Sequence, residues 1–161
     1  MARIPTANRP RRPRERIGVV SVEFALVFPL LALLVFGTLE MGFTFGDWMV
    51  LSEAVRTGAR AASLGKTTDA VCAAVLAHAP GIVPEQLTIT CEYRTWTDPS
   101  WGSWQSLADS AGANTANPAD EIRVTVSYQH SLLAGPLLSD LAGGTRHESF
   151  TLQCAGTTRR E

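Results

Sequence analysis

Between residues 17 and 39 the chain carries almost no polar side chains. The run contains 23 residues, and Glu23 is the only charged one among them. An α-helix rises 1.5 Å per residue, so this run would be about 34 Å long, close to the roughly 30 Å hydrocarbon core of a bilayer. The pattern therefore predicts a transmembrane helix.

The helical pattern continues beyond this run, with a different distribution of side chains. Apolar residues recur on one face at i, i+3 and i+4 spacing, at Leu51, Ala54, Val55, Ala59 and Ala62. Charged residues such as Glu53 and Arg56 take the other side. We predict one helix from about 17 to 64, kinked at Pro29 and ended by Gly65, whose outer half packs on a small domain.

The remaining sequence predicts that domain. A second helix is expected from Thr68 to Ala79, with Thr67 or Thr68 as its N-cap. Alternating apolar and polar residues predict strands over 87–94, 122–128 and 147–154. The expected fold class is α+β, in which the long N-terminal transmembrane helix and the second helix accompany a three-stranded antiparallel sheet, an arrangement that is pilin-like. A Trp/Ser/Ala-rich loop, 95–121, is expected between the first two strands.

Charge is distributed unevenly along the chain. Basic residues number 14 and acidic residues 15, but six arginines fall within the first 16 positions. Positive charge stays inside, so we expect a basic cytoplasmic leader (1–18), a transmembrane helix (19–45) and an extracytoplasmic domain (46–161). The arginines are thereby explained without nucleic acid as a partner. A cleaved secretory signal is the competing interpretation, but the apolar run is longer than usual and no Ala-x-Ala site follows it.

Glu23 is the most informative residue of the apolar run. A carboxylate at the centre of a bilayer costs about 2.5–3.5 kcal/mol, and less near the interface. If the chain were cut after Gly18, the new amine of Val19 could neutralise Glu23, most usefully between neighbouring subunits, and so set the register of an assembly. Alternatively, Glu23 reaches the cytoplasmic interface and has no further role.

Two motifs give the segment a family resemblance. The first is Gly18-x4-Glu23-Phe24-Ala25-Leu26-Val27-x-Pro29, followed by Glu40-x-Gly42; the second runs from Glu53 to Arg60 and departs from the family pattern at Val55. Together, over 18–60, they resemble the TadE-like family, pseudopilins or minor pilins of the tight-adherence (Flp) type IV pilus machinery. The resemblance implies cleavage between Gly18 and Val19 by a prepilin-type peptidase, insertion in the cell (inner) membrane, and partners among other pilins, pseudopilins and pilus assembly membrane proteins.

The remaining chemistry is sparse. Cys72, Cys91 and Cys154 fall on predicted inward faces of an exported domain; a Cys72–Cys91 disulfide is favoured, and Cys91–Cys154 is its rival. No metal site, cofactor site or catalytic motif is predicted, so we expect a protein that is not an enzyme. Three tryptophans in the loop 95–121 either cap a small core or offer a binding surface. The alternative function is a single-pass, membrane-tethered binding module without a role in pili.

Overall fold

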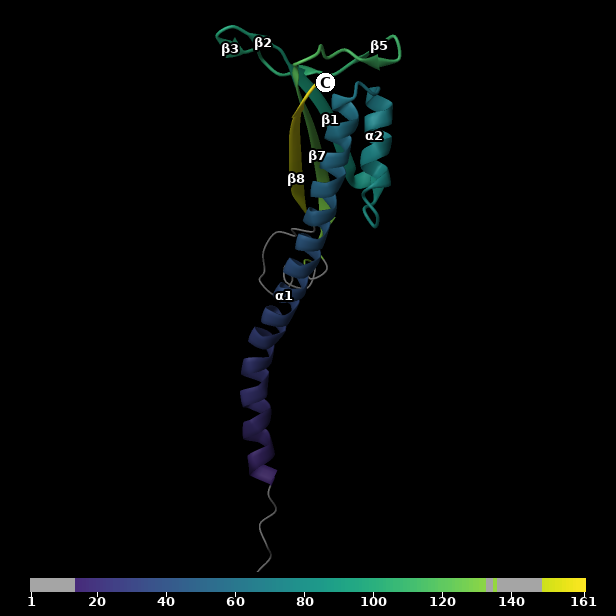
Figure 1. The fold of residues 1–161 in the computed structure, drawn as a ribbon. Coiled ribbons are helices and arrows are strands. Elements are labelled where there is room, and N and C mark those ends of the chain that lie inside the picture. The colour runs from purple at the N-terminus through teal and green to yellow at the C-terminus, as the bar shows by residue number, and fades with distance from the viewer. Residues whose placement is uncertain (1–13, 133–134, 136–148) are drawn as a thin grey trace, which may run out of the picture. The chain divides into compact units, whose positions relative to one another are not determined.

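The computed structural model describes residues 14–132, 135 and 149–161, with side chains from Gly18 onward. The leader residues 1–13 lie outside this description. The chain divides into two compact units, one ending at Thr38 and the other running from Leu39 to Glu161. Helix α1 (Arg14–Ser63) belongs to both, and the predicted helix from about 17 to 64 is confirmed (Figure 1).

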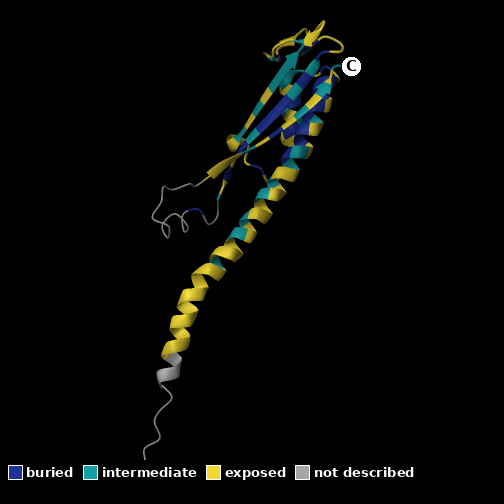
Figure 2. Cartoon of the chain, turned by 90° about the vertical axis from the view of Figure 1, so that its left-hand side faces the viewer, coloured by how far each residue is buried: buried dark blue, intermediate teal, exposed yellow. Residues whose placement is uncertain are grey.

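The first part of α1, which we define as residues 18–38, is exposed on all sides. Leu26, Leu30 and Leu34 are 66–75% exposed, and almost the whole segment is drawn as exposed in Figure 2. The helix continues through Pro29, and the kink proposed there stays a prediction. Because this part has no polar face, it lacks the amphipathic pattern by which a helix packs on a soluble domain.

The second unit is built on an antiparallel sheet of four strands. Its order is β4-β1-β7-β8, which comprises Gln105–Ser106, Leu87–Arg94, Glu121–Ser131 and Ser149–Arg159. The expected three-stranded sheet is wrong by one strand, because β4 pairs with Glu92 and Tyr93 of β1. A strand of two residues is too short to produce an alternating pattern, so the sequence does not reveal it.

The segment 95–121 is more ordered than the loop predicted there. It contains one hairpin of β2 (Trp96–Thr97) and β3 (Ser100–Trp101), and a second of β5 (Asp109–Ser110) and β6 (Ala113–Asn114). The first two residues of the last predicted strand, 147–154, lie outside the described residues. The observed strand β8 extends to Arg159 rather than ending at Cys154.

The second part of α1, Leu39–Ser63, supplies one side of the core. The five apolar residues predicted to form its packing face are all buried, as are Ile122, Val124 and Val126 of β7. Gly58 permits a close approach, because a Cβ there would lie 2.5 Å from Val75 Cγ2 of α2 (Thr68–Ala77). On α2, Val71 and Val75 are buried, whereas Leu76 is 43% exposed. The α+β fold class is therefore confirmed, with α1 and α2 packed together beside the sheet.

Hydrogen bonds from the segment 95–121 hold the helix ends. Asp109 accepts bonds from Thr68 N at 2.8 Å and from Thr68 Oγ1 at 2.6 Å, at the start of α2. Asn114 Nδ2 donates to Ala62 O at 2.8 Å and to Lys66 O at 3.0 Å, where α1 ends. These partners satisfy backbone groups that a helix end leaves open. α2 ends at Ala77, two residues before its predicted end, and a short 3₁₀ turn, η1 (Pro84–Gln86), leads into β1.

Gly65 terminates α1 as predicted. Its φ is +79°, in the left-handed region that glycine adopts without a steric penalty. The C-terminal residues complete this helix end, with Arg160 Nη1 donating to Ser63 O at 3.2 Å and Glu161 N donating to the same oxygen at 3.1 Å. The end of α1 is thus held by residues from two distant parts of the sequence, Asn114 and the C-terminal Arg160 and Glu161.

Candidate functional site

The candidate site residues Gly18, Val19 and Glu23 lie in the first part of α1. All three are exposed, and no atom lies within 4 Å of a Cβ built on Gly18. Val19 and Glu23 are four residues apart, so they occupy the same face of the helix, one turn from each other. An amine created at Val19 would therefore lie near the Glu23 carboxylate of the same chain, or of a neighbouring chain packed in parallel.

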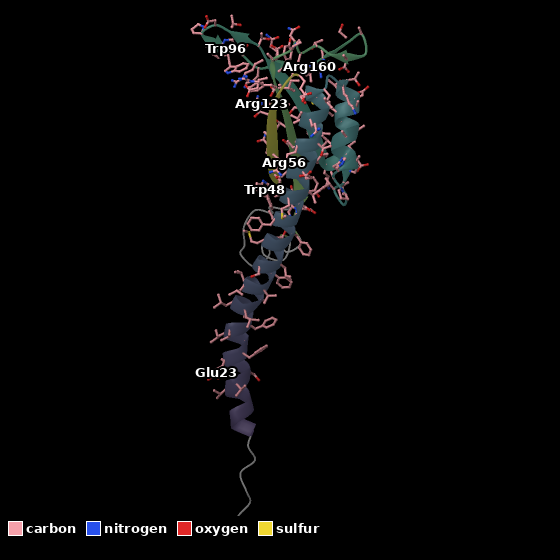
Figure 3. All side chains as sticks on the ribbon, viewed as in Figure 1. Glu23, Trp48, Arg56, Trp96, Arg123 and Arg160 are labelled. Atoms are coloured by element: carbon pink, nitrogen blue, oxygen red, sulfur yellow. The ribbon has the colours of Figure 1, made fainter. Side chains whose placement is uncertain are left out.

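The Glu23 carboxylate has no partner among the residues whose side chains are described. No hydrogen bond or ion pair reaches it from Gly18 onward. The side chains next to it are mostly apolar, and the ring of Phe24 lies beside that of Phe28, with ring centroids 5.3 Å apart. In a bilayer such a carboxylate requires either a cationic partner or access to the interface. Figure 3 labels Glu23 on this part of the helix.

The same segment is the candidate membrane anchor. One helix among the described residues, over Gly18–Ser63, is long and apolar enough to cross a bilayer, and none of its most apolar window is buried. An exposed apolar surface of this extent is unfavourable in water and favourable in lipid. The segment is therefore suited to anchor the chain in a membrane.

A buried histidine links the sheet to the second part of α1. His130, at the end of β7, is 6% exposed, and its Nδ1 lies 2.7 Å from Asp47 Oδ2. Its Nε2 lies 3.4 Å from Glu40 Oε1, within ion-pair distance but outside hydrogen-bond geometry. Two carboxylates seven residues apart thus face one imidazole, an arrangement that ties β7 to α1.

The sequence analysis did not identify this cluster. The sequence does contain one signal for this cluster, the spacing of Glu40 and Asp47. They lie two helical turns apart on one face, and two carboxylates on one face predict a cation opposite them. Burial raises the pKa of Tyr128, and the Asp47 carboxylate raises it further. Burial and the nearby carboxylate thus both disfavour ionisation of the Tyr128 hydroxyl.

The cysteines are free thiols, and the structure brings one predicted pair together. Cys72 of α2 and Cys91 of β1 line the same cavity of about 330 Å³. Burial, and secondarily Cys72, raise the pKa of Cys91 to about 11. Burial, followed by Asp69 and Asp109, also raises the pKa of Cys72. A raised pKa favours the protonated thiol of each cysteine, and their disulfide stays a prediction.

The rival disulfide does not suit the topology. Cys91 lies on β1 and Cys154 on β8, and β7 separates these strands. Strands two positions apart are about 9.5 Å apart, beyond the reach of a disulfide. A disulfide between these two cysteines would require adjacent strands, which this sheet does not provide. Cys154 is buried, with its Sγ 3.8 Å from Ser52 Oγ of α1.

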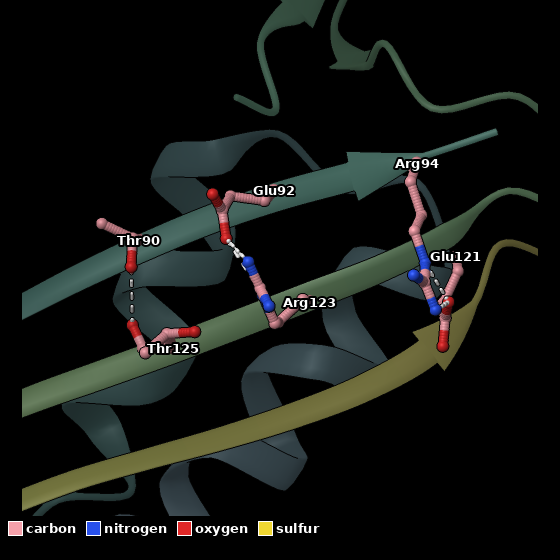
Figure 4. A network of polar contacts seen from close by, with 6 residues as sticks. All are labelled: Thr90, Glu92, Arg94, Glu121, Arg123 and Thr125. Atoms are coloured by element: carbon pink, nitrogen blue, oxygen red, sulfur yellow. Dashed lines mark hydrogen bonds and ion pairs between the residues drawn. The ribbon is translucent and has the colours of Figure 1, made fainter. Parts of the chain in front are cut away.

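The three tryptophans of the segment 95–121 do not cap the core. Trp96 is 50% exposed, Trp101 and Trp104 are half-buried, and none belongs to the buried cluster. They lie beside a row of cross-strand ion pairs on the face of the sheet away from α1. In this row Arg94 Nε donates to Glu121 Oε2 at 2.6 Å and Arg123 Nε donates to Glu92 Oε2 at 3.0 Å (Figure 4).

Comparison with known proteins supports the resemblance derived from the motifs. The model of a family described as TadE-like protein matches residues 18–60, which cover the first part of α1 and most of the second. The chain matches no curated protein and no solved structure. Residues 18–60 are therefore a TadE-like segment, as predicted, while the expected likeness of the fold to pilins has no structural match.

Proposed function

We propose that this chain is a membrane-anchored, non-catalytic structural protein, a pseudopilin or minor pilin that supports assembly of a tight-adherence (Flp) pilus or secretion through its machinery. The observation that carries this proposal is the family match over 18–60, which falls on the exposed apolar helix containing Gly18 and Glu23. A helix apolar on all sides, with one carboxylate, is suited to lateral packing in a membrane.

The proposed orientation places the N-terminus in the cytoplasm. Six arginines in the first 16 residues favour retention of this end on the cytoplasmic side of the inner membrane. The second unit then lies outside the cytoplasm, attached through a single membrane-spanning helix.

Glu23 has the assembly role in this proposal. A prepilin-type peptidase cuts between Gly18 and Val19, and the new ammonium group of Val19 pairs with Glu23 of an adjacent pilin or pseudopilin. An unpaired carboxylate is unfavourable in lipid, so chains packed out of register lose up to about 2.5–3.5 kcal/mol per unpaired charge, the value for the bilayer centre. The pairing selects one axial register between neighbouring helices.

The first experiment determines the N-terminus of the chain extracted from membranes, by Edman sequencing or intact mass. We expect a mature start at Val19. A chain that keeps its first 18 residues would contradict the cleavage step.

The second experiment tests the register role. We expect Glu23→Ala to remain in the membrane but to lose crosslinking to other pilus components. The matched control is Glu53→Ala, which removes a carboxylate 64% exposed on the second part of the same helix and should leave crosslinking unchanged. Normal assembly of the Glu23→Ala chain would remove the register role.

One observation favours a second candidate, a membrane-tethered binding module. Trp96 is half-exposed at a surface cavity, which a purely structural residue does not require. Under this alternative, α1 is only an anchor, so the leader stays intact and Glu23→Ala has no effect. The two experiments above therefore separate the candidates.

A further inference from the structure

A surface cavity lies beside the hairpin of β2 and β3. It has a volume of about 310 Å³ and is lined by Trp96, Trp101, Ala119 and Arg159. Trp96 and Trp101 pair across the hairpin, with ring centroids 5.2 Å apart and ring planes at 76°, so the two rings form adjoining walls. Half of the Trp96 surface is open to solvent. Figure 3 labels Trp96 on this hairpin.

The neighbouring Trp104 also lies beside arginines, but these arginines are paired with other groups of the protein. The guanidinium groups of Arg94 and Arg123 lie over its ring at 4.5 and 4.0 Å from the centroid. Each of these arginines is also paired with a glutamate on the opposite strand, as Figure 4 shows. Glutamates of the protein already neutralise the two arginines on Trp104, so this stack has no free charge with which to bind a ligand.

Arg159 differs from these two arginines. Its guanidinium lies 5.6 Å from the centre of the Trp101 ring, and the residue is exposed. Its cross-strand neighbour is Glu121, but Arg94 binds that carboxylate. Among the residues that the structure describes, the Arg159 side chain has no ion pair and donates no hydrogen bond. The cavity thus carries one uncompensated positive charge beside an exposed aromatic wall.

Another residue that lines the cavity, Ala119, is held in a strained backbone conformation. Ala119 has a φ of +73°, which costs a non-glycine residue about 1–3 kcal/mol. Two hydrogen bonds hold it, from Ala119 N to Arg160 O at 3.0 Å and from Asp120 N to Asn117 O at 3.1 Å. Backbone strain of this kind concentrates at functional sites, and here it falls on a residue that lines the cavity.

We propose that this cavity binds a carbohydrate that carries a carboxylate, such as a uronic acid. The C–H groups on one face of a sugar ring are attracted to the electron-rich face of an indole, while the hydroxyl groups remain in water. The planar guanidinium of Arg159 matches a carboxylate with two parallel hydrogen bonds. A cavity of about 310 Å³ is at the small end for ligand sites and fits one or two sugar rings.

The inference does not depend on a role in pili. Neither leader cleavage nor Glu23 enters it, so a failure of the binding experiment leaves the proposed function untouched, and the reverse also holds. The inference instead names the class of ligand that the exposed Trp96 recognises.

The test is calorimetric titration of the full chain in detergent micelles with tetragalacturonic acid and with its fully methyl-esterified form. We expect saturable binding of the acid and at least tenfold weaker binding of the ester, because esterification removes the charge and leaves the ring faces in place. Equal binding of the two forms, or no saturable binding of the acid, would overturn the proposal.

Two substitutions locate the site. Trp96→Ala should weaken binding of the acid about tenfold or more, whereas Trp48→Ala, which removes a tryptophan 49% exposed on α1, should not change it. Arg159→Gln should weaken binding of the acid at least tenfold without affecting the ester, and Arg56→Gln, at an arginine whose side chain is 78% exposed on α1, should affect neither. Equal losses in a variant and its control would show that binding occurs elsewhere.

Folding and ligand class are checked in parallel. An unchanged melting temperature shows that Trp96→Ala and Arg159→Gln keep the fold. If Trp96→Ala does not keep the fold, Arg159→Gln alone tests the proposal. A titration with oligothymidylate, which also combines stacking with negative charge, should show at least tenfold weaker binding. Comparable affinity would identify a general site for stacked anions and would contradict the assignment to carbohydrate.

Discussion

The two parts of α1 place the same kinds of residue in opposite environments. Leu34, in the first part, is 66% exposed, whereas Leu51, in the second, is completely buried. The first part is apolar on every side, while the second confines its apolar residues to one stripe and carries charges on the other side. A helix without a polar face requires an apolar solvent, and a helix with one stripe requires only one packed partner. The comparison shows that the distribution of apolar residues around the helix, rather than their presence, distinguishes a segment suited to a membrane from one packed on a sheet.

Charging the first part should have the largest effect. The double variant Leu31→Arg and Leu34→Arg adds two cations to the apolar segment, which disfavours insertion by about 5–7 kcal/mol on translocon scales. We expect the chain to be released from membranes by alkaline carbonate. The control is Met49→Arg, at a residue 67% exposed in the second part, which should stay in the membrane pellet. Retention of the double variant would show that the first part does not anchor the chain.

The second prediction concerns the buried stripe. Leu51→Ala should lower the free energy of unfolding by about 2–5 kcal/mol, because it leaves a cavity between α1 and the sheet. Leu34→Ala, which removes the same atoms from an exposed site, should leave the unfolding of the domain unchanged. Urea unfolding of the full chain in detergent micelles, followed by near-ultraviolet circular dichroism, measures both. Similar losses for the two variants would contradict the division of α1 into two environments.

Local patterns predict well where a stripe or an alternation decides the structure. All five apolar residues of the second part of α1 are buried as expected, and β1 has the predicted bounds, Leu87 to Arg94. In these segments, side-chain spacing alone determines which face meets the core. The family match spans both parts of α1, and the candidate residues Gly18, Val19 and Glu23, in the first part, come from the sequence motif alone.

Contacts between distant residues could not be predicted in this way. Strand β4, the Asn114 bonds at the end of α1 and the His130–Asp47 pair each join positions 12 to 83 residues apart. The spacing of residues within one element does not show which residue of another element they meet, as for His130 of β7 and Asp47 of α1. The cavity beside Trp96 likewise depends on Arg159, which lies beyond the predicted end of the last strand and comes close only because β8 extends that far.

The third prediction compares two glycines of α1. A Cβ at Gly58 would lie 2.5 Å from Val75 Cγ2, whereas a Cβ at Gly37 meets nothing within 4 Å. Gly58→Ala should therefore destabilise the domain by about 1–3 kcal/mol through overpacking against α2. Gly37→Ala should not lower its stability. The same urea titrations provide the measurement, and a Gly58→Ala chain as stable as the wild type would show that α1 and α2 can separate without cost.

The smallest expected effect lies on the charged side of the second part. Arg56 Nη1 is 3.7 Å from Glu53 Oε2, and the two side chains are 78% and 64% exposed. Solvent screens such a pair, so a double-mutant cycle of Glu53→Gln and Arg56→Gln should give a coupling energy of no more than about 0.5 kcal/mol. A coupling above about 1 kcal/mol would mean that another group shields this side of the helix from water. That result would reduce the contrast between the two parts of α1, because the second part would then pack on more than one face.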